Sequence, residues 1–309
     1  MKVKEKSPVA KSKKINKGQY GFYFVLPFFI GYLLFQLYPM IYTFYLSLTS
    51  WNGITAVKEF VGLDNYARLL SDNVFLKSIF NTILIWIMSV IPRMAVALLI
   101  AVLLTQFKKI KGGNFFRAVF YFPNLVNASS VAVLLALILD WQTGALNNIL
   151  LKLNLIAEPI KWLSSPFYAR SAVAITIWWM WFGHSMVLLM TGILSVPEEL
   201  LESATIDGAG QWKKFTAITF PLLRPTFSYV FVTSLIGGLQ NFDIPRILTD
   251  GLGTPDKSIL TSVMHLYNLA FRSQQFGYGA TIAYGLFVIV LFVSIITFRV
   301  INPKSQEGS

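Results

Sequence analysis

Polar and aromatic side chains inside the apolar stretches of this chain are the first candidates for chemistry. In one stretch, Trp181 and His184 lie three residues apart, so they share a face of a helix. In a later stretch, Ser234, Gly238 and Asn241 follow one another at helical spacings of four and three. A sugar stacks its C–H faces on aromatic rings, and its hydroxyls need hydrogen-bond donors and acceptors. The pattern therefore predicts a pathway for a sugar, in which the glycine provides room.

The same residues also have purely structural interpretations. Small and polar residues in membrane helices often serve only to let helices pack and hydrogen-bond, as Ser234 and Gly238 would. Of the three tryptophans in the range 178–181, at least two are expected to face lipid or to anchor the helix at the interface. His184 is open to either interpretation, as a structural histidine or as a contact for the sugar.

Two further polar residues call for an explanation. Arg93 follows Pro92 deep in an apolar stretch, where an unpaired charge costs roughly 2.5–3.5 kcal/mol on insertion scales. Asp243 is the available partner, so we expect a structural pair or a gate, with an anion site for an acidic sugar as the alternative. His265 lies in a loop with no second His or Cys nearby, so we expect it to be solvated and predict no metal site.

The sequence lacks the arrangements that catalysis requires. There are no cysteines, and the fourteen Asp and Glu residues lie mostly in loops without a His/Asp/Glu cluster, so we predict no catalytic residues. No G-x-x-x-x-G-K-[ST] motif occurs, so the chain is not expected to hold ATP phosphates itself. A membrane-embedded enzyme and an ion-coupled secondary transporter remain alternatives, although the second favours midplane carboxylates and inverted repeats, and neither is evident.

The candidate residues must be positioned by membrane helices. Of the 309 residues, 55% are hydrophobic and only 13% are charged, against about 25% charged in an average soluble domain. A helix needs about 20 mainly apolar residues to cross a bilayer, and six stretches meet that length. They cover residues 20–49, 79–106, 115–139, 171–195, 225–247 and 279–301. We therefore predict an all-α polytopic membrane protein with six transmembrane helices.

The distribution of Lys and Arg predicts the orientation of these helices. The tail at 1–19, the loops at 107–117 and 196–224 and the C-terminal end together carry 16 basic residues, against 9 in the three other loops. The excess marks the first set, with both termini, as cytoplasmic. The net charge of +12 is thus a topology signal, and nucleic acid is not an expected partner.

The loop between the fourth and fifth stretches is unusually polar. Ser195 and Glu198 have the spacing of a capping box, which predicts the start of a short helix. The Asp-Gly pair at 207–208 should end it, and a second short helix should follow, until Pro221 and Pro225 redirect the chain. Neither helix is long enough to cross a membrane. The pair is either an amphipathic hairpin resting on lipid or a docking element for a soluble partner.

Several motifs carry a resemblance to a known family. The segments Glu202-Ser203-Ala204 and Asp207-Gly208-Ala209, with the two prolines that follow, resemble the EAA loop of binding-protein-dependent ABC transport permeases of the maltose type, which take up carbohydrates. The likeness extends over nearly the whole chain, through FRAVFYFP, GALNNIL, LQNFDIPRILTDG and LYNLAFRSQQFGYGAT. Two departures are Ser203, where the family has Ala, and DGLGTPD at 250–256, where it commonly has Gly-Gly-Pro.

The resemblance implies a six-helix permease domain over 20–301, with a coupling loop at 196–225 and short cytoplasmic tails at 1–19 and 302–309. It implies that Glu202, Ala204, Asp207, Gly208 and Ala209 couple the permease to an ATPase. The implied partners are a second permease, two ATPase subunits that bind ATP and Mg²⁺, an extracytoplasmic binding protein and the sugar itself. No cofactor is expected in this chain.

Overall fold

The computed structural model describes residues 17–55, 58–106 and 112–301. Over these ranges the regular secondary structure is helical apart from one isolated β-bridge between Thr49 and Phe60, and turns and loops connect the helices. The elements are α1 (Lys17–Tyr32), the π-helix η1 (Leu33–Leu37), α2 (Tyr38–Ser47), α3 (Asp64–Ser71), α4 (Asn73–Gln106), α5 (Gly113–Tyr121), the 3₁₀ helix η2 (Phe122–Leu125), α6 (Ala128–Ile138), α7 (Ala145–Lys152), the 3₁₀ helix η3 (Trp162–Ser164), α8 (Pro166–Leu194), α9 (Glu198–Ile206), α10 (Gln211–Lys214), the π-helix η4 (Phe215–Thr219), α11 (Phe220–Leu222), α12 (Arg224–Leu239), α13 (Asp243–Leu248), α14 (Ser262–Tyr267), the π-helix η5 (Asn268–Arg272) and α15 (Phe276–Ile301).

Four long helices of the described chain are apolar enough to cross a membrane, and the number rises to six if each of two bent helix pairs is one span. The all-α polytopic architecture predicted from the sequence is therefore confirmed. The predicted tails at 1–19 and 302–309 lie outside the described residues, except for the first turn of α1, which begins at Lys17.

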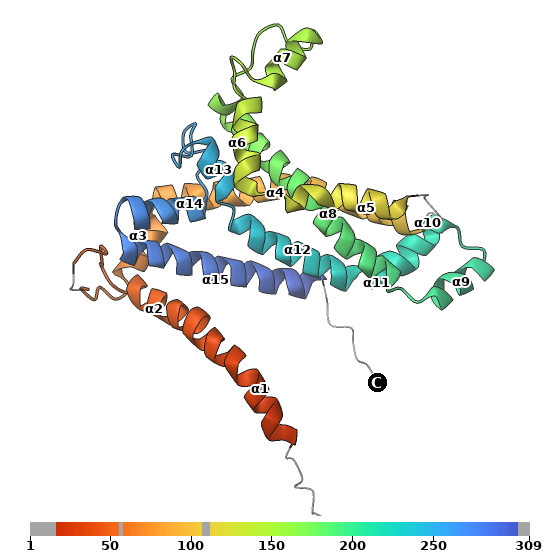
Figure 1. Cartoon of the computed structure of the whole chain (residues 1–309), viewed down its shortest axis with the longest axis horizontal. Helices are drawn as coiled ribbons and strands as arrows, with labels where there is room; N and C mark the ends of the chain where they lie inside the picture. The colour runs from red at the N-terminus through yellow and green to blue at the C-terminus, as the bar shows by residue number, and fades with distance from the viewer. Residues whose placement is uncertain (1–16, 56–57, 107–111, 302–309) are drawn as a thin grey trace, which may run out of the picture.

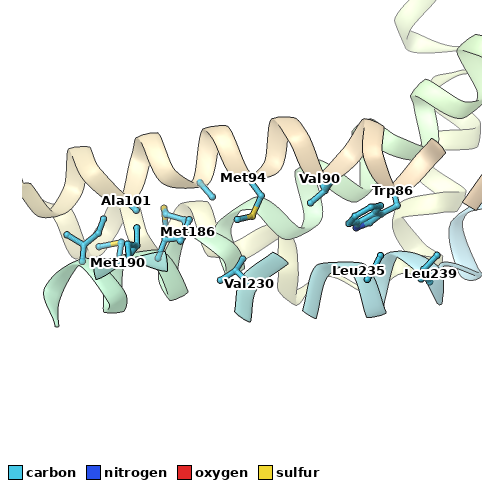
Figure 2. Packing of buried hydrophobic residues seen from close by; sticks show 13 residues of the cluster. Trp86, Val90, Met94, Ala101, Met186, Met190, Val230, Leu235 and Leu239 are labelled. Carbon is cyan, nitrogen blue, oxygen red and sulfur yellow. The ribbon is translucent and has the colours of Figure 1, made fainter. Parts of the chain in front are cut away.

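The centre of the bundle is formed by α4, α8 and α12. Figure 2 shows side chains of α4 directed toward those of the other two helices, among them Val90, Met94, Met186 and Val230. Ala97 and Ala101 of α4 are completely buried, and such small residues allow helix backbones to approach closely. This packing holds the helices that carry the candidate sugar contacts.

The third predicted span is not one straight helix, contrary to the expectation for residues 115–139. The part from Gly113 to Leu125 runs along α8, whereas α6 is bent away from it by 86° (Figure 1). The bend follows Pro123, and Val126 is extended. Asn127 then starts a new helix, because its side-chain oxygen accepts a hydrogen bond from the N–H of Ser129. Apolar periodicity continues across the bend, so the pattern could not reveal it.

The fifth predicted span has a bend of 62° between Gln211–Leu222 and Arg224–Leu248, at the position where Pro221 and Pro225 were expected to redirect the chain. The capping box predicted from Ser195 and Glu198 is not formed, so that prediction is wrong. Ser195 instead caps the end of α8, where its Oγ donates to the carbonyl oxygen of Gly192, and α9 begins after Pro197 without a side-chain cap. Pro197 is compatible with a helix start because the first N–H groups have no intrahelical acceptor.

The predicted end of α9 is confirmed. Gly208 has a φ of +77°, its N–H donates to the carbonyl oxygen of Thr205, and the N–H of Ala209 donates to that of Ala204. These two bonds form a Schellman motif, in which glycine takes the left-handed conformation at little cost. The hairpin of α9 and α10 projects beyond the ends of the long helices (Figure 1).

His265 is buried, with 8% of its surface exposed, so the prediction that it is solvated is wrong. Its Nε2 lies 3.6 Å from Oδ2 of Asp72, which also accepts a hydrogen bond of 2.7 Å from the hydroxyl of Tyr278. These residues join the start of α4 to α14 and α15. Since Asp72 is far in the sequence from His265 and Tyr278, only tertiary packing could show that this loop histidine is covered.

The burial of His265 predicts a pH-dependent stability. Burial lowers the pKa of His265 below its usual value, and the attraction of Asp72 does not compensate. The unfolded histidine takes up a proton below about pH 6.5, whereas the folded one resists it. The neutral His265 therefore contributes its full stabilisation above that pH, and this contribution is lost as the pH falls toward the pKa of the folded protein. The Tm of the purified protein should fall between about pH 7 and about pH 5.5, and H265Q should flatten this fall. An unchanged slope in H265Q would contradict the prediction.

Candidate functional site

A cavity of about 360 Å³ lies between α4, α8 and α12. Small-molecule sites have volumes of roughly 300–1,000 Å³, so its size fits such a ligand. The five residues predicted to contact a sugar all line it, namely Trp181, His184, Ser234, Gly238 and Asn241. Trp181 and His184 lie on one face of α8, and Ser234 and Gly238 on one face of α12, as their spacing predicted. Asn241 was expected on the same helix, but α12 ends at Leu239, and Asn241 reaches the cavity from the break before α13. That these five residues contact a substrate stays a prediction.

Ser234 and Gly238 have visible packing roles on one side of the cavity. The hydroxyl of Ser234 donates to the carbonyl oxygen of Phe231, and its oxygen accepts a hydrogen bond of 3.4 Å from Nε1 of Trp86. A Cβ on Gly238 would lie 2.1 Å from Cδ1 of Trp86. Gly238 thus makes room for the Trp86 ring, and both residues serve to seat α4 against α12 at the wall of the cavity.

Trp181, His184 and Asn241 are the predicted residues with the most capacity for a ligand. Trp181 is 43% exposed, and its ring meets that of His184 edge to face at 5.7 Å between centroids. The backbone of Asn241 is held by the hydroxyl of Thr261, which donates to its carbonyl oxygen at 2.7 Å. Its side-chain Nδ2 has no hydrogen-bond acceptor among the described residues. An aromatic ring and a free amide donor thus line the same space.

The other two tryptophans of this stretch point elsewhere. Trp178 stacks on Phe182 with 5.9 Å between ring centroids, and Trp179 is exposed on the outside of α8. Neither lines the cavity.

Sequence reasoning missed part of the wall that α4 contributes. Trp86, Ser89 and Arg93 all line the cavity, and their spacing of three and four residues puts them on one helix face. That spacing could have identified them together. Asn124 also lines the cavity, and its place follows from the bend after η2, which no local pattern predicted.

The expected pair of Arg93 with Asp243 is not formed. Both residues line the cavity, but no ion pair joins them in the part of the chain that the structure describes. Asp243 begins α13, beyond the end of α12, whereas Arg93 lies within α4. In the described residues, no three His, Asp or Glu side chains come together as metal ligands would.

The predicted coupling residues lie together at the tip of the molecule. Glu202 and Asp207 are exposed, and Ala204 and Ala209 are half-buried beside Gly208. Nζ of Lys214 donates to the hydroxyl of Thr205 at 3.0 Å and ties α10 to α9. Two large apolar side chains near this tip are strongly exposed, Ile206 by 88% and Trp212 by 76%. Exposed apolar groups with a polar rim are typical of a protein-binding surface.

The sequence of this chain is similar to a known family of transport proteins over nearly its whole length. Residues 21–305 match the model of the family described as the binding-protein-dependent transport system inner membrane component. The lactose transport system permease protein LacF of Rhizobium radiobacter is 34% identical over 279 residues, which cover 90% of this chain and 91% of that protein. The arabinooligosaccharides transport system permease protein AraP of Bacillus subtilis is 32% identical over 286 residues, covering 92% and 89%.

The fold is also that of a solved importer. A permease chain in the crystal structure of a bacterial alginate ABC transporter, in complex with an alginate pentasaccharide-bound periplasmic protein, superposes with a TM-score of 0.79. It is 21% identical, and the match covers 95% of this chain and 97% of that one. Together with the family match over nearly the whole chain, these findings make the protein a multi-pass inner membrane protein, a transporter component whose ATPase is a separate subunit. The chain belongs to the binding-protein-dependent ABC transporter permeases, in the carbohydrate-uptake group of that family.

Proposed function

We propose that this subunit forms one side of a path by which a sugar or oligosaccharide enters the cytoplasm from an extracytoplasmic binding protein. The observation that carries the proposal is the cavity, where Trp181, His184 and Asn241 present the ring and hydrogen-bonding groups that a sugar requires. The names of the relatives support it, since they refer to lactose and to arabinooligosaccharides. The ring of Trp181 would stack on the sugar, and the amide of Asn241 would bind a hydroxyl.

The hairpin of α9 and α10 would be the coupling element and would lie in the cytoplasm. Two ATPase subunits would bind ATP and Mg²⁺ and close on each other, and the hairpin would pass this movement to α8 and α12, between which it is inserted. Glu202 would meet a basic group of the ATPase, and the Schellman turn at Gly208 would keep the hairpin rigid. Alternating access to the cavity follows from this movement.

A second permease would complete the path. The span from Gly21 to Ser47 has no buried residue in its most apolar part, and it diverges from the rest of the bundle (Figure 1). Its aromatic side chains, such as Phe24 and Phe28, are exposed. Lipid or a partner subunit must therefore cover this helix, because such a surface is stable only in an apolar environment.

Transport into proteoliposomes tests the proposal. The complex, purified with its ATPases and partner permease, should take up a labelled glycan only when ATP is inside and the loaded binding protein outside. W181A should lower uptake at least about tenfold without loss of subunits, because one stacking ring is removed. The exposed W179A is the matched control and should transport normally. Uptake driven by an ion gradient without ATP would instead support a secondary transporter.

A further inference from the structure

Arg93 is a buried cation for which the described chain supplies no counterion. Only 6% of its surface is exposed, and its Nε has no hydrogen-bond acceptor among the described residues. The ion pairs found in the described ranges involve other basic residues, namely Lys77, His265 and Arg272. A guanidinium inside a membrane span is costly unless a partner satisfies it. A buried guanidinium therefore requires a partner that the described part of the chain does not provide.

The position of Arg93 directs it to the cavity. It follows Trp86 by two turns on the same face of α4, which places it roughly 10 Å further along the helix from that ring. Val90 and Met94, which precede and follow it, belong to the apolar core. The cavity is therefore the polar space that Arg93 borders, together with His184 and Ser89.

The other charges of the cavity do not compensate Arg93. Asp243 is the acidic residue in the cavity wall, and it lies at the start of α13. Among the described residues, Asp243 forms no ion pair with Arg93, nor with Arg246, whose guanidinium lies over the rings of Phe242 and Tyr267. Arg93 has no acidic residue one helical turn away, since its neighbours on α4 are apolar or uncharged.

We propose that Arg93 binds an acidic group of the transported glycan, a carboxylate such as that of a uronic acid. A guanidinium and a carboxylate fit each other through two parallel N–H···O bonds, which is the strongest neutralisation that a buried arginine can obtain. The ring of Trp181 and the amide of Asn241 then hold the neutral part of the sugar. This assignment rests on the proposed function and specifies its substrate class.

A carboxylate from the partner permease is the competing explanation. Such a group would have to reach Arg93 through the cavity, and it would occupy the space through which the substrate must pass. A carboxylate that arrives with the substrate avoids this conflict, because it leaves again with the substrate. The two explanations differ in whether removal of the guanidinium affects sugar selectivity or subunit assembly.

Binding of a matched pair of glycans to the intact complex tests the proposal. The probes are trigalacturonate and its fully methyl-esterified form, which differ in charge but share the same rings. Binding is measured by tryptophan fluorescence on the purified permease–ATPase complex in lipid nanodiscs. The wild type should bind the acid at least about tenfold more tightly than the ester. R93M, of similar length, should bind the acid roughly 10- to 100-fold more weakly and the ester as before. R93K should keep part of the preference, because it retains the charge without the planar fork.

Three results would overturn the proposal. If the wild type binds both probes equally tightly, or binds neither of them, an anion site is contradicted. Equal weakening of both probes in R93M assigns Arg93 a structural role. Loss of the partner permease from purified R93M assigns it to the subunit contact. ATP-dependent uptake of a neutral glycan by the same complex would leave the proposed function intact in each case, whereas failure to transport any glycan would count against both.

Discussion

Replacement of Ile206 by aspartate should abolish transport while leaving the subunit folded. The side chain is 88% exposed at the end of α9, so it contributes little to packing within the chain. In the proposed complex it would enter an apolar contact with the ATPase, next to Trp212. A carboxylate buried there would cost at least about 2 kcal/mol, which weakens association roughly 30-fold or more. Co-purification of the ATPase with the tagged permease, together with ATP-driven uptake, measures the effect.

The conservative variant I206L is the control for this prediction. It keeps the apolar contact and should assemble and transport nearly as the wild type does, because a volume-conserving swap costs less than about 1.5 kcal/mol. Normal membrane levels of I206D would show that the fold tolerates the charge. Full assembly and uptake in I206D would show that the tip of α9 does not contact the ATPase.

Replacement of Gly183 by alanine should prevent the subunit from folding. A Cβ at this position of α8 would lie 1.9 Å from the carbonyl oxygen of Phe120 and 2.6 Å from its carbonyl carbon. Both are backbone atoms, so α5 and α8 would have to separate along their contact. Overpacking of this kind costs about 3 kcal/mol or more, a large share of the stability of a typical domain. Gly183 also separates Phe182 from His184, so the cavity wall would shift with the helix.

G237A is the matched control for the second prediction. This glycine also lies inside a long helix, α12, but a Cβ there would meet nothing within 4 Å. Membrane levels, resistance to protease and detergent extraction as a single species should be near normal for G237A and strongly reduced for G183A. Equal behaviour of the two variants would show that α5 and α8 do not pack as closely as described.

The sequence predicted the faces of helices better than their paths. Trp181 with His184, and Ser234 with Gly238, were placed on common faces by spacing alone, and each pair does line one cavity. The same argument applied to Arg93 would have found the wall of α4. Spacing works because side-chain direction in a helix repeats every 3.6 residues and depends only on local geometry.

Long-range features escaped the same reasoning. The bend at Asn127 interrupts a stretch whose hydropathy is continuous, and the burial of His265 depends on α4, α14 and α15 meeting. Whether Arg93 pairs with Asp243 depends on how α4 packs against α13, and among the described residues no such ion pair is formed. Each of these outcomes is decided by contacts between residues distant in sequence, which no periodic pattern records.

By itself, the sequence determined that the chain is all-helical and spans a membrane. It also located the short hairpin that interrupts the spans. Composition, apolar length and the Asp-Gly turn at 207–208 were sufficient, because they act within one or two helical turns. Only the tertiary structure decided that α4, α8 and α12 line one cavity and that Arg93 borders it with no counterion among the described residues. The reason is that a cavity and an unpaired charge are properties of the space between helices, which exists only after they have packed.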